Sequence, residues 1–387
     1  MKKWGLLLTL VMMLGMMPTL ADEDKTVSER FSCGDWEYVL LEDGTAEIVD
    51  YRERGWRGKT KELEIPEQLE GYAVTSIGPN ALDGSYRLKS VLIPDGVIRI
   101  GDFAFSSCCN LTSVTFPDSV TFIGNYAFGS CTSLTSVRIP DGITNISDGM
   151  FALCSGLTSV TIPDGITKIG DQAFISCYGL TNISMPDSVT SIGMLAFSNC
   201  DKLTDVMIPD GVTSIGSAAF NHCSSLTSVT IPDSVVTLGA NPFDNCENLE
   251  YIIVSPDHPS LAVIDGVLFE KTEKRLVACP YAHTAEAYAV PQGTQTIGVG
   301  AFSSCASLSS VSIPSSVTRI EDEAFLACTG LTSVAIPDSV TFIGRSAFEF
   351  CADVVLTVPR DSYAAEYAKA NGIPYTYPDA NDWLNGD

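Results

Sequence analysis

Basic residues and histidine are scarce in this sequence. Lysine and arginine total 22 against 47 acidic residues, which gives a formal net charge of −25 at pH 7. A chain of this charge repels phosphate backbones, which argues against nucleic-acid binding. The three histidines, His222, His258 and His283, lie far apart in the sequence. We therefore expect no histidine-rich metal site, and we interpret His222 and His258 as loop residues.

Long apolar runs are also scarce, since the only one lies at the N-terminus. Lys2 and Lys3 precede the apolar stretch 4–17, and Thr19-Leu20-Ala21 has the small-x-small pattern of a cleavage site. We interpret residues 1–21 as a signal peptide, whose removal takes away two lysines and leaves a net charge of −27. No other run approaches the roughly 20 apolar residues of a transmembrane helix. The sequence thus predicts a secreted or cell-surface protein with no transmembrane segment in the mature chain.

A period of 23 residues organises most of the chain. The motif Ile-Pro-Asp-Gly-Val at 93–97 returns at 116–120 and 139–143 with small changes. The repeat prolines are Pro94, Pro117, Pro140, Pro163, Pro186, Pro209, Pro232, Pro291, Pro314 and Pro337. The repeat cysteines are Cys108, Cys131, Cys154, Cys177, Cys200, Cys223, Cys246, Cys305, Cys328 and Cys351. With an earlier, looser copy at Pro66, these positions define eleven units.

Each unit has the pattern of a short strand followed by a turn. Polar and apolar residues alternate from Ser113 to Phe116, as in a strand with one buried face. Pro117 ends the strand because proline cannot donate a ladder hydrogen bond. Asp118 favours a turn in which its side chain bonds its own backbone, and we expect Gly124 to allow a tight corner.

A single 23-residue coil cannot bury its own apolar side chains, whereas stacked copies cover one another. Strands that repeat in one direction pair in parallel. The sequence therefore predicts a β-rich repeat solenoid, a right-handed leucine-rich-repeat coil with a parallel sheet on one face. One phenylalanine per coil should form a continuous aromatic spine, made of Phe105, Phe128, Phe151, Phe174, Phe197, Phe220, Phe243, Phe302, Phe325 and Phe348.

The units resemble the BspA-type bacterial surface leucine-rich repeats. The resemblance rests on Leu111-x-x-Val114-x-Phe116-Pro117 followed by Ile123-Gly124-x-x-Ala127-Phe128-x-x-Cys131, and it covers roughly residues 65–359. It implies a secreted or surface protein of the adhesin or binding class, with no shared catalytic residues. Because such repeats define a scaffold, the resemblance transfers the fold better than the function.

Both ends of the repeat array should be capped, because an open stack exposes apolar core and unpaired strand edges. We assign 22–64 to an N-terminal cap with a β-hairpin around Asp43-Gly44. The repeats occupy 65–357, and 358–387 form a C-terminal helix cap and tail. Residues 247–290 are an irregular insertion with a β-hairpin whose polar turn carries Lys271 and Lys274. This hairpin is either a structural irregularity or part of a binding surface.

Thirteen cysteines in an exported chain normally indicate disulfides. Ten of them recur at one coil position, where parallel in-register side chains keep the Cβ atoms about 4.8 Å apart, beyond the disulfide range of about 3.5–4.5 Å. The pattern predicts a column of buried, reduced thiols. Cys33, Cys109 and Cys279 lie outside the column, and their pairing is left open.

No residue pattern marks a catalytic or metal centre, and we expect no cofactor. Cys279 and His283 lie four residues apart, but no orienting residue or oxyanion donor accompanies them. A column of aspartates after the repeat prolines would suit calcium, but each aspartate serves its own turn and we assign the column a structural role. The column contains Asp95, Asp118, Asp141, Asp164, Asp187, Asp210, Asp233 and Asp338.

The outward positions of the predicted strands form the best candidate binding surface. Most are small polar residues such as Ser113 and Thr115. They offer hydrogen bonds but lack the tryptophan, tyrosine and arginine side chains that contribute most of the binding free energy in interfaces. Arg138, Asp205 and Met207 break this pattern and join the candidate contact residues. The alternative is a solvated sheet face whose serines and threonines simply suit strands.

The sequence therefore favours a non-catalytic recognition or adhesion protein that binds a protein or glycan, with a host surface or extracellular matrix among the candidate partners. A self-associating structural component of the surface is one alternative, although capped ends and the net charge oppose assembly. A carbohydrate-active enzyme with a carboxylate pair is another, although no pair stands out from the repeat.

Overall fold

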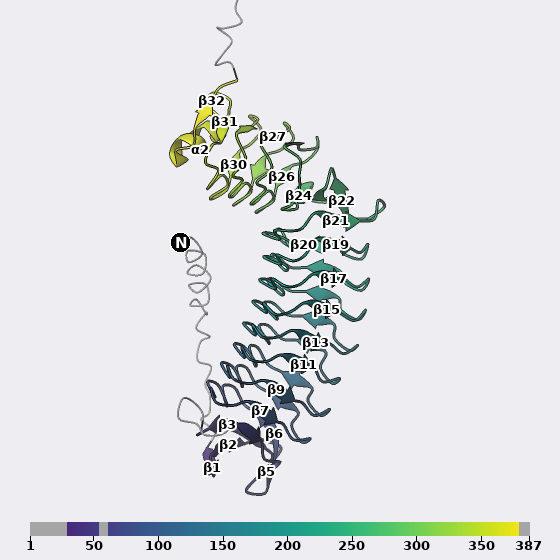
Figure 1. Ribbon diagram of the computed structural model, residues 1–387, viewed down its shortest axis with the longest axis vertical. Coiled ribbons are helices and arrows are strands. Elements are labelled where there is room, and N and C mark those ends of the chain that lie inside the picture. The colour runs from purple at the N-terminus through teal and green to yellow at the C-terminus, as the bar shows by residue number, and fades with distance from the viewer. Residues whose placement is uncertain (1–28, 54–60, 379–387) are drawn as a thin grey trace, which may run out of the picture.

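The coils stack into an elongated, curved solenoid. The computed structural model describes residues 29–53 and 61–378. The predicted signal peptide 1–21 and the last part of the predicted C-terminal tail, 379–387, lie outside these residues. The stack bends at the level of β21 (Tyr251–Val254) and β22 (Leu261–Ile264), as Figure 1 shows. We call the coils before this level the first stack and those after it the second stack.

Each regular coil contributes one strand to each of two parallel ladders. The first ladder contains β4 (Glu62–Glu64), β7 (Ser90–Leu92), β9 (Ser113–Thr115), β11 (Ser136–Arg138), β13 (Ser159–Thr161), β15 (Asn182–Ser184), β17 (Asp205–Met207), β19 (Ser228–Ile231), β21, β25 (Ala287–Ala289), β27 (Ser310–Ser312), β29 (Ser333–Ala335), β31 (Val355–Thr357) and β32 (Tyr375–Thr376). The second ladder contains β6 (Tyr72–Ile77), β8 (Arg99–Ile100), β10 (Phe122–Ile123), β12 (Asn145–Ile146), β14 (Lys168–Ile169), β16 (Ser191–Ile192), β18 (Ser214–Ile215), β20 (Thr237–Leu238), β24 (Arg275–Ala278), β26 (Thr296–Ile297), β28 (Arg319–Ile320) and β30 (Phe342–Ile343).

The 23-residue period sets the register of both ladders. Val137 pairs with Val160 in the first ladder, and Ile146 pairs with Ile169 in the second. Equivalent apolar side chains therefore lie directly above one another and are removed from water by their neighbours. The predicted parallel sheet is confirmed as the first ladder. The second ladder is an addition, because the sequence predicted only one short strand in each unit.

The third side of each coil is a turn that carries the phenylalanine and the cysteine. Except at Phe243 and Phe348, the N–H of each spine phenylalanine donates to the carbonyl of the alanine-equivalent position one coil later, as from Phe105 to Ala127 O at 2.8 Å. The rings from Phe105 to Phe243 stack with centroids 5.1–5.9 Å apart. A second run joins Phe302, Phe325 and Phe348.

The expectation of one continuous aromatic spine was wrong. Among the described residues, no ring contact joins Phe243 to Phe302. The coil before Phe302 has Cys279 in the register of the spine, since its N–H donates to Ala301 O at 2.7 Å, the bond that a spine phenylalanine makes. The stack of rings is therefore interrupted by a coil that has no aromatic side chain at this position.

The glycine of the coil is needed for a different reason from the one expected. A Cβ atom on Gly124 would lie 2.6 Å from the Asp102 nitrogen of the preceding coil, and one on Gly193 would lie 2.6 Å from the Asp171 nitrogen. The left-handed φ values instead fall on side-chain-bearing residues, such as Tyr126 at 52°. The glycine thus permits close approach of two backbones, whereas its own φ is ordinary.

The cysteine column lies in the apolar interior. All thirteen cysteines are free, and only Cys33 and Cys109 are not buried. Each column sulfur lies against a carbonyl oxygen of the preceding coil, as Cys154 Sγ does at 3.1 Å from Phe128 O. Burial raises the pKa of Cys108 and the pKa of Cys154, each to about 12. The predicted column of reduced thiols agrees with this geometry.

Both predicted caps are present. β2 (Trp36–Leu40) and β3 (Ala46–Tyr51) form a hairpin whose turn places Gly44 at φ 82°, and β1 (Arg30–Cys33) pairs with β2. β3 pairs in parallel with β6 and so covers the edge of the second ladder. A short strand, β5 (Gln68–Leu69), adds to β6. At the other end, α2 (Tyr363–Asn371) begins at Ser362, whose hydroxyl accepts from Ala365 N–H, and ends at Gly372.

The insertion separates the apolar cores of the two stacks. The first ladder stops at β21 and restarts at β25, while β22 and β23 (Val267–Glu270) join the second ladder through β24. Successive strand side chains point to opposite faces. Leu268 and Val277 accordingly pack into the core of the first stack, whereas Val267 and Leu276 pack into that of the second.

Polar side chains tie the two stacks together at this level. Asn241 Nδ2 donates to Gly300 O at 2.7 Å, and Ser304 Oγ donates to Asn245 Oδ1 at 3.0 Å. Arg275 Nη2 donates both to Leu238 O at 2.9 Å and to the buried Glu270 carboxylate at 2.7 Å.

His258 is a further tie, and it lies in the loop between β21 (Tyr251–Val254) and β22 (Leu261–Ile264), as interpreted from the sequence. Its side chain is fully buried. Nδ1 accepts from the N–H groups of Ser260 and Leu261, and Nε2 lies 3.0 Å from Pro232 O. Because Nδ1 is an acceptor, the proton of the neutral ring belongs on Nε2, which then donates to Pro232. The imidazole thus satisfies backbone groups where the insertion leaves the regular coil.

We expect Gly193→Ala to lower the free energy of unfolding by about 2 kcal/mol or more, because two close-packed backbones must separate. Gly165 is the control, since its Cβ would meet only Ile143 O and Asp141 O at 3.6 and 3.7 Å. Gly165→Ala should be neutral or stabilising by up to about 1 kcal/mol. Chemical denaturation of both variants checks this, and equal losses would contradict the role of close approach.

We expect a thiol reagent to modify only Cys33 and Cys109 rapidly in the folded protein, because the other thiols are buried away from the reagent. All thirteen should react after denaturation without reductant. The double variant Cys33→Ser/Cys109→Ser should lose the rapid phase. Fewer than about eight reactive thiols in the denatured protein would show that the column contains disulfides.

Asp244 should make stability depend on pH. Burial raises its pKa to about 6 from 3.8, an effect that Ser303 and Asn245 partly counteract. The folded state then binds the proton more tightly than the unfolded chain, so this stabilisation is full below about pH 4 and is lost as pH rises through about 6. Asp244→Asn should remove about 2–3 kcal/mol of that change. Denaturation at several pH values checks this, with Asp257→Asn at an exposed position as the control variant.

Candidate binding surface

The outward side chains of the first ladder form a regular face. Because side chains alternate along a strand, the apolar middle residue of each strand points inward and its polar neighbours point outward. The register aligns these neighbours into rows across the strands. One row contains Ser184, Met207, Thr230 and Ile253. The other contains Asn182 and Asp205, followed by Ser228 and Tyr251 on the next two strands.

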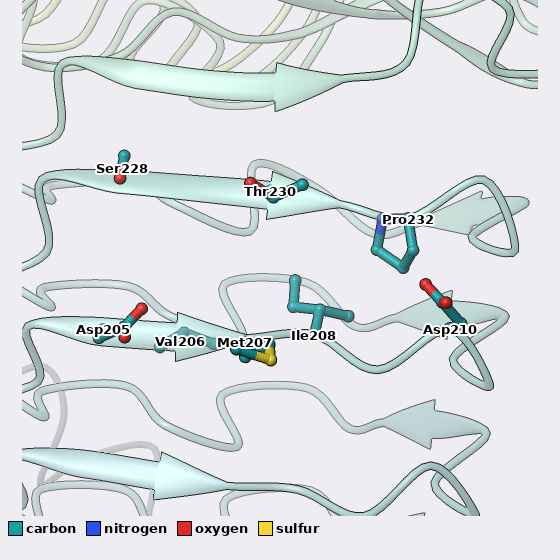
Figure 2. A pocket seen from close by; sticks show the side chains of 8 residues that line it. All are labelled: Asp205, Val206, Met207, Ile208, Asp210, Ser228, Thr230 and Pro232. Atoms are coloured by element: carbon teal, nitrogen blue, oxygen red, sulfur yellow. The ribbon is translucent and has the colours of Figure 1, made fainter.

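A shallow groove of about 340 Å³ lies between β17 and β19. Three residue pairs join β15 to β17, but only Met207 and Thr230 pair between β17 and β19. Figure 2 shows Asp205 and Met207 along β17 facing Ser228 and Thr230 on β19, with Asp210 beyond the ends of the strands. The groove therefore lies beside a join with a single residue pair, whereas β9 and β11, and β13 and β15, have no paired residues.

Three large apolar side chains project from this part of the face. Met207 is 76% exposed, Tyr251 62% and Ile253 49%. We call these three residues the apolar patch. The other outward positions around them are small polar residues or carboxylates. A group of large apolar side chains left in water on an otherwise polar face is typical of an interaction site.

The surroundings of the apolar patch are acidic. Residues 182–187, 205–210, 228–233 and 250–257, which include the strands β15 to β21 and the turns after them, contain no lysine or arginine, and Lys202 lies in the turn before β17. Their exposed carboxylates are Asp187, Asp205, Asp210, Asp233, Glu250 and Asp257. In the described part of the chain, none of these carboxylates forms an ion pair. The groove thus combines apolar area with unneutralised negative charge.

The structure brings together only two of the residues predicted from the sequence. Asp205 and Met207 line the groove. Ser113 and Thr115 are exposed on β9, which lies in the same ladder but several coils away. Arg138 on β11 bonds the Asp141 carboxylate at 3.0 Å, so its charge is engaged within its own coil.

Lys271 and Lys274 lie on a different side of the coil. They belong to the turn between β23 and β24, and β24 continues the second ladder through its pairing with β26. Lys271 Nζ donates to His258 O, so it also helps to hold the insertion. These lysines therefore do not share the outward face of the first ladder with the apolar patch.

Tyr251 and Ile253 were missed because the insertion was assigned a start at residue 247. The coil pattern in fact persists through β21, since Val229 pairs with Ile252 and Ile231 with Val254 at the usual spacing of 23 residues. Continuing the repeat by one strand would have placed Tyr251 and Ile253 at outward positions.

The remaining candidate chemistry does not assemble into a centre. Cys279 is buried with its sulfur near Pro280 O, while His283 Nε2 lies 2.9 Å from Asp265 O, so these two side chains have separate partners. The turns after the repeat prolines close through backbone bonds, as from Val120 N–H to Pro117 O, rather than through the aspartate side chain as expected. No group of three or more potential metal ligands occurs within residues 29–53 and 61–378. The same residues include no helix with the length and apolarity to cross a membrane.

Comparison with known proteins extends this description. The sequence matches the model of the BspA-type leucine-rich repeat region over residues 58–181, 167–287 and 278–358. A solved leucine-rich cell surface protein from Faecalibacterium prausnitzii is 29% identical, with a TM-score of 0.61, and the alignment covers 92% of this chain and 99% of that one. A leucine-rich repeat protein from Bacteroides ovatus is 26% identical with a TM-score of 0.48, over 90% and 99% of the two chains. Curated proteins give no match.

The family model covers well over half of the chain, and its repeats coincide with the coils that form the two ladders. The sequence resemblance to surface leucine-rich repeats is therefore confirmed. The chain belongs to the BspA-type leucine-rich repeat family.

Proposed function

We propose that the protein is exported and acts, secreted or at the cell surface, as a non-catalytic recognition or adhesion protein. It engages a protein or glycan through the outward face of the first ladder, with the groove between β17 and β19 at the centre. The single observation that carries this proposal is the apolar patch beside the groove, where Met207, Tyr251 and Ile253 interrupt a face of small polar residues.

The location rests on two further observations. Residues 1–21 have the charge and apolar pattern of an export signal. The similar Faecalibacterium prausnitzii protein is described as a cell surface protein. Both support a role outside the cytoplasm, where a long stack of coils offers an extended face to a large partner.

The residues support a binding mechanism in which the burial of surface area provides the free energy. Large apolar side chains that become desolvated in the centre of an interface supply most of its free energy, while the surrounding small polar side chains exclude water. Serine and threonine along the rows, such as Thr230 beside Met207, can add hydrogen bonds without large entropic cost. No step of bond making or breaking is needed for this role.

Binding of the mature chain, residues 22–387, to immobilised extracellular-matrix proteins and to a glycan array tests the proposal. Met207→Ser combined with Tyr251→Ser should weaken binding to any captured ligand by about tenfold or more, because both apolar anchors are lost. Surface plasmon resonance measures the affinity.

The matched control is Leu92→Ser, which removes an apolar side chain that is 50% exposed on β7 of the same ladder, far from the groove. It should change the affinity by less than about twofold. Wild-type affinity in the Met207/Tyr251 variant, or an equal loss in both variants, would contradict binding at the groove.

A further inference from the structure

The chemical character of the groove between β17 and β19 restricts the kinds of partner that it can bind. Asp205 and Asp210 both line the groove, and Met207 stands between them on the same stretch of chain. Carboxylates therefore flank an apolar side chain that is three-quarters exposed. A partner that fills this site must match both features, since an unpaired charge buried in an interface costs free energy.

The surrounding charges favour a cationic partner. The four segments that frame the apolar patch have six exposed carboxylates and no basic side chain, as described above. The net charge of the whole chain has the same sign, so the field of the protein accelerates the approach of a cation. An anionic polysaccharide or a nucleic acid would be repelled from the same place.

The apolar side chains favour a protein over a neutral sugar. Sugar recognition depends on aromatic faces and on many hydrogen-bond donors, but Tyr251 is the only aromatic side chain of the patch. Met207 is unbranched and flexible, a property that suits contact with apolar side chains of varied shape. Ile253 adds aliphatic area next to Tyr251 on β21.

We propose that the groove and apolar patch bind a basic segment of a partner protein, in which lysine or arginine alternates with large apolar side chains. This inference rests on the proposed function and specifies its partner. The apolar side chains of the segment pack on Met207, Tyr251 and Ile253. Its cationic groups pair with Asp205 and Asp210, and the outer carboxylates increase the rate of association.

Fluorescence anisotropy with three labelled synthetic peptides of equal length tests the proposal on the mature chain. One peptide alternates lysine with leucine, the second lysine with serine, and the third glutamate with leucine. At an ionic strength of about 0.15 M, where distant charges are screened, the lysine–leucine peptide should bind about tenfold more tightly than either of the others. Equal binding of the lysine–serine peptide would overturn the proposal, because only bulk charge would then be recognised.

Paired variants locate the binding. Met207→Ser with Tyr251→Ser, and Asp205→Asn with Asp210→Asn, should each weaken binding of the lysine–leucine peptide by about fivefold or more. Leu92→Ser is the apolar control. Asp118→Asn with Asp164→Asn is the charge control, since it removes the same charge from the first ladder outside the groove. Both controls should stay within about twofold of wild type.

The outcomes separate this inference from the proposed function. Equal losses in the groove and control charge variants would overturn the assignment of the peptide to the groove. If a matrix protein or glycan requires Met207 and Tyr251 while no peptide does, the partner chemistry is wrong and the recognition role stands. If peptide and matrix ligands all ignore Met207 and Tyr251, both proposals fail.

Discussion

The structure depends on in-register contact between identical positions of successive coils. No coil has a core of its own, because its valines, isoleucines, leucines, phenylalanine and cysteine belong to a core cluster that runs through many successive coils. The backbone bonds follow the same rule, since carbonyls and N–H groups on three sides of each coil pair across a step of about 23 residues. Everything else is an adjustment to this stacking, including the caps, the glycines and the buried histidine of the insertion.

The fold could be predicted almost completely because periodicity is a property of the sequence itself. The spacing of Pro117 and Cys131 from their counterparts fixes the length of a coil, and alternation from Ser113 to Phe116 fixes which face is buried. The second ladder was not predicted, because its strands in the regular coils, such as β10, have only two residues and cannot show an alternating pattern. The reason for Gly124 was also hidden, since it depends on the backbone of the preceding coil rather than on local sequence.

The candidate site was only partly predictable, for the same physical reason. Asp205 and Met207 could be recognised as exceptions to a repeating row, and Arg138 was selected by the same logic although Asp141 engages its charge. Tyr251 and Ile253 lie in the last strand before the insertion, where the pattern had been treated as lost. The groove itself lies between β17 and β19, where a single residue pair joins the strands, and composition gives no sign of this backbone geometry.

The insertion gives the solenoid a mechanical discontinuity. Within a stack, tension along the axis is shared among ladder hydrogen bonds and a common core, but between β21 and β25 it passes through the hairpin and a few side chains such as Asn241 and Arg275. A solenoid under tension along its axis would therefore yield first at this level. The two stacks, each with its own cap and core, would stay folded on either side of this level and would extend independently of each other.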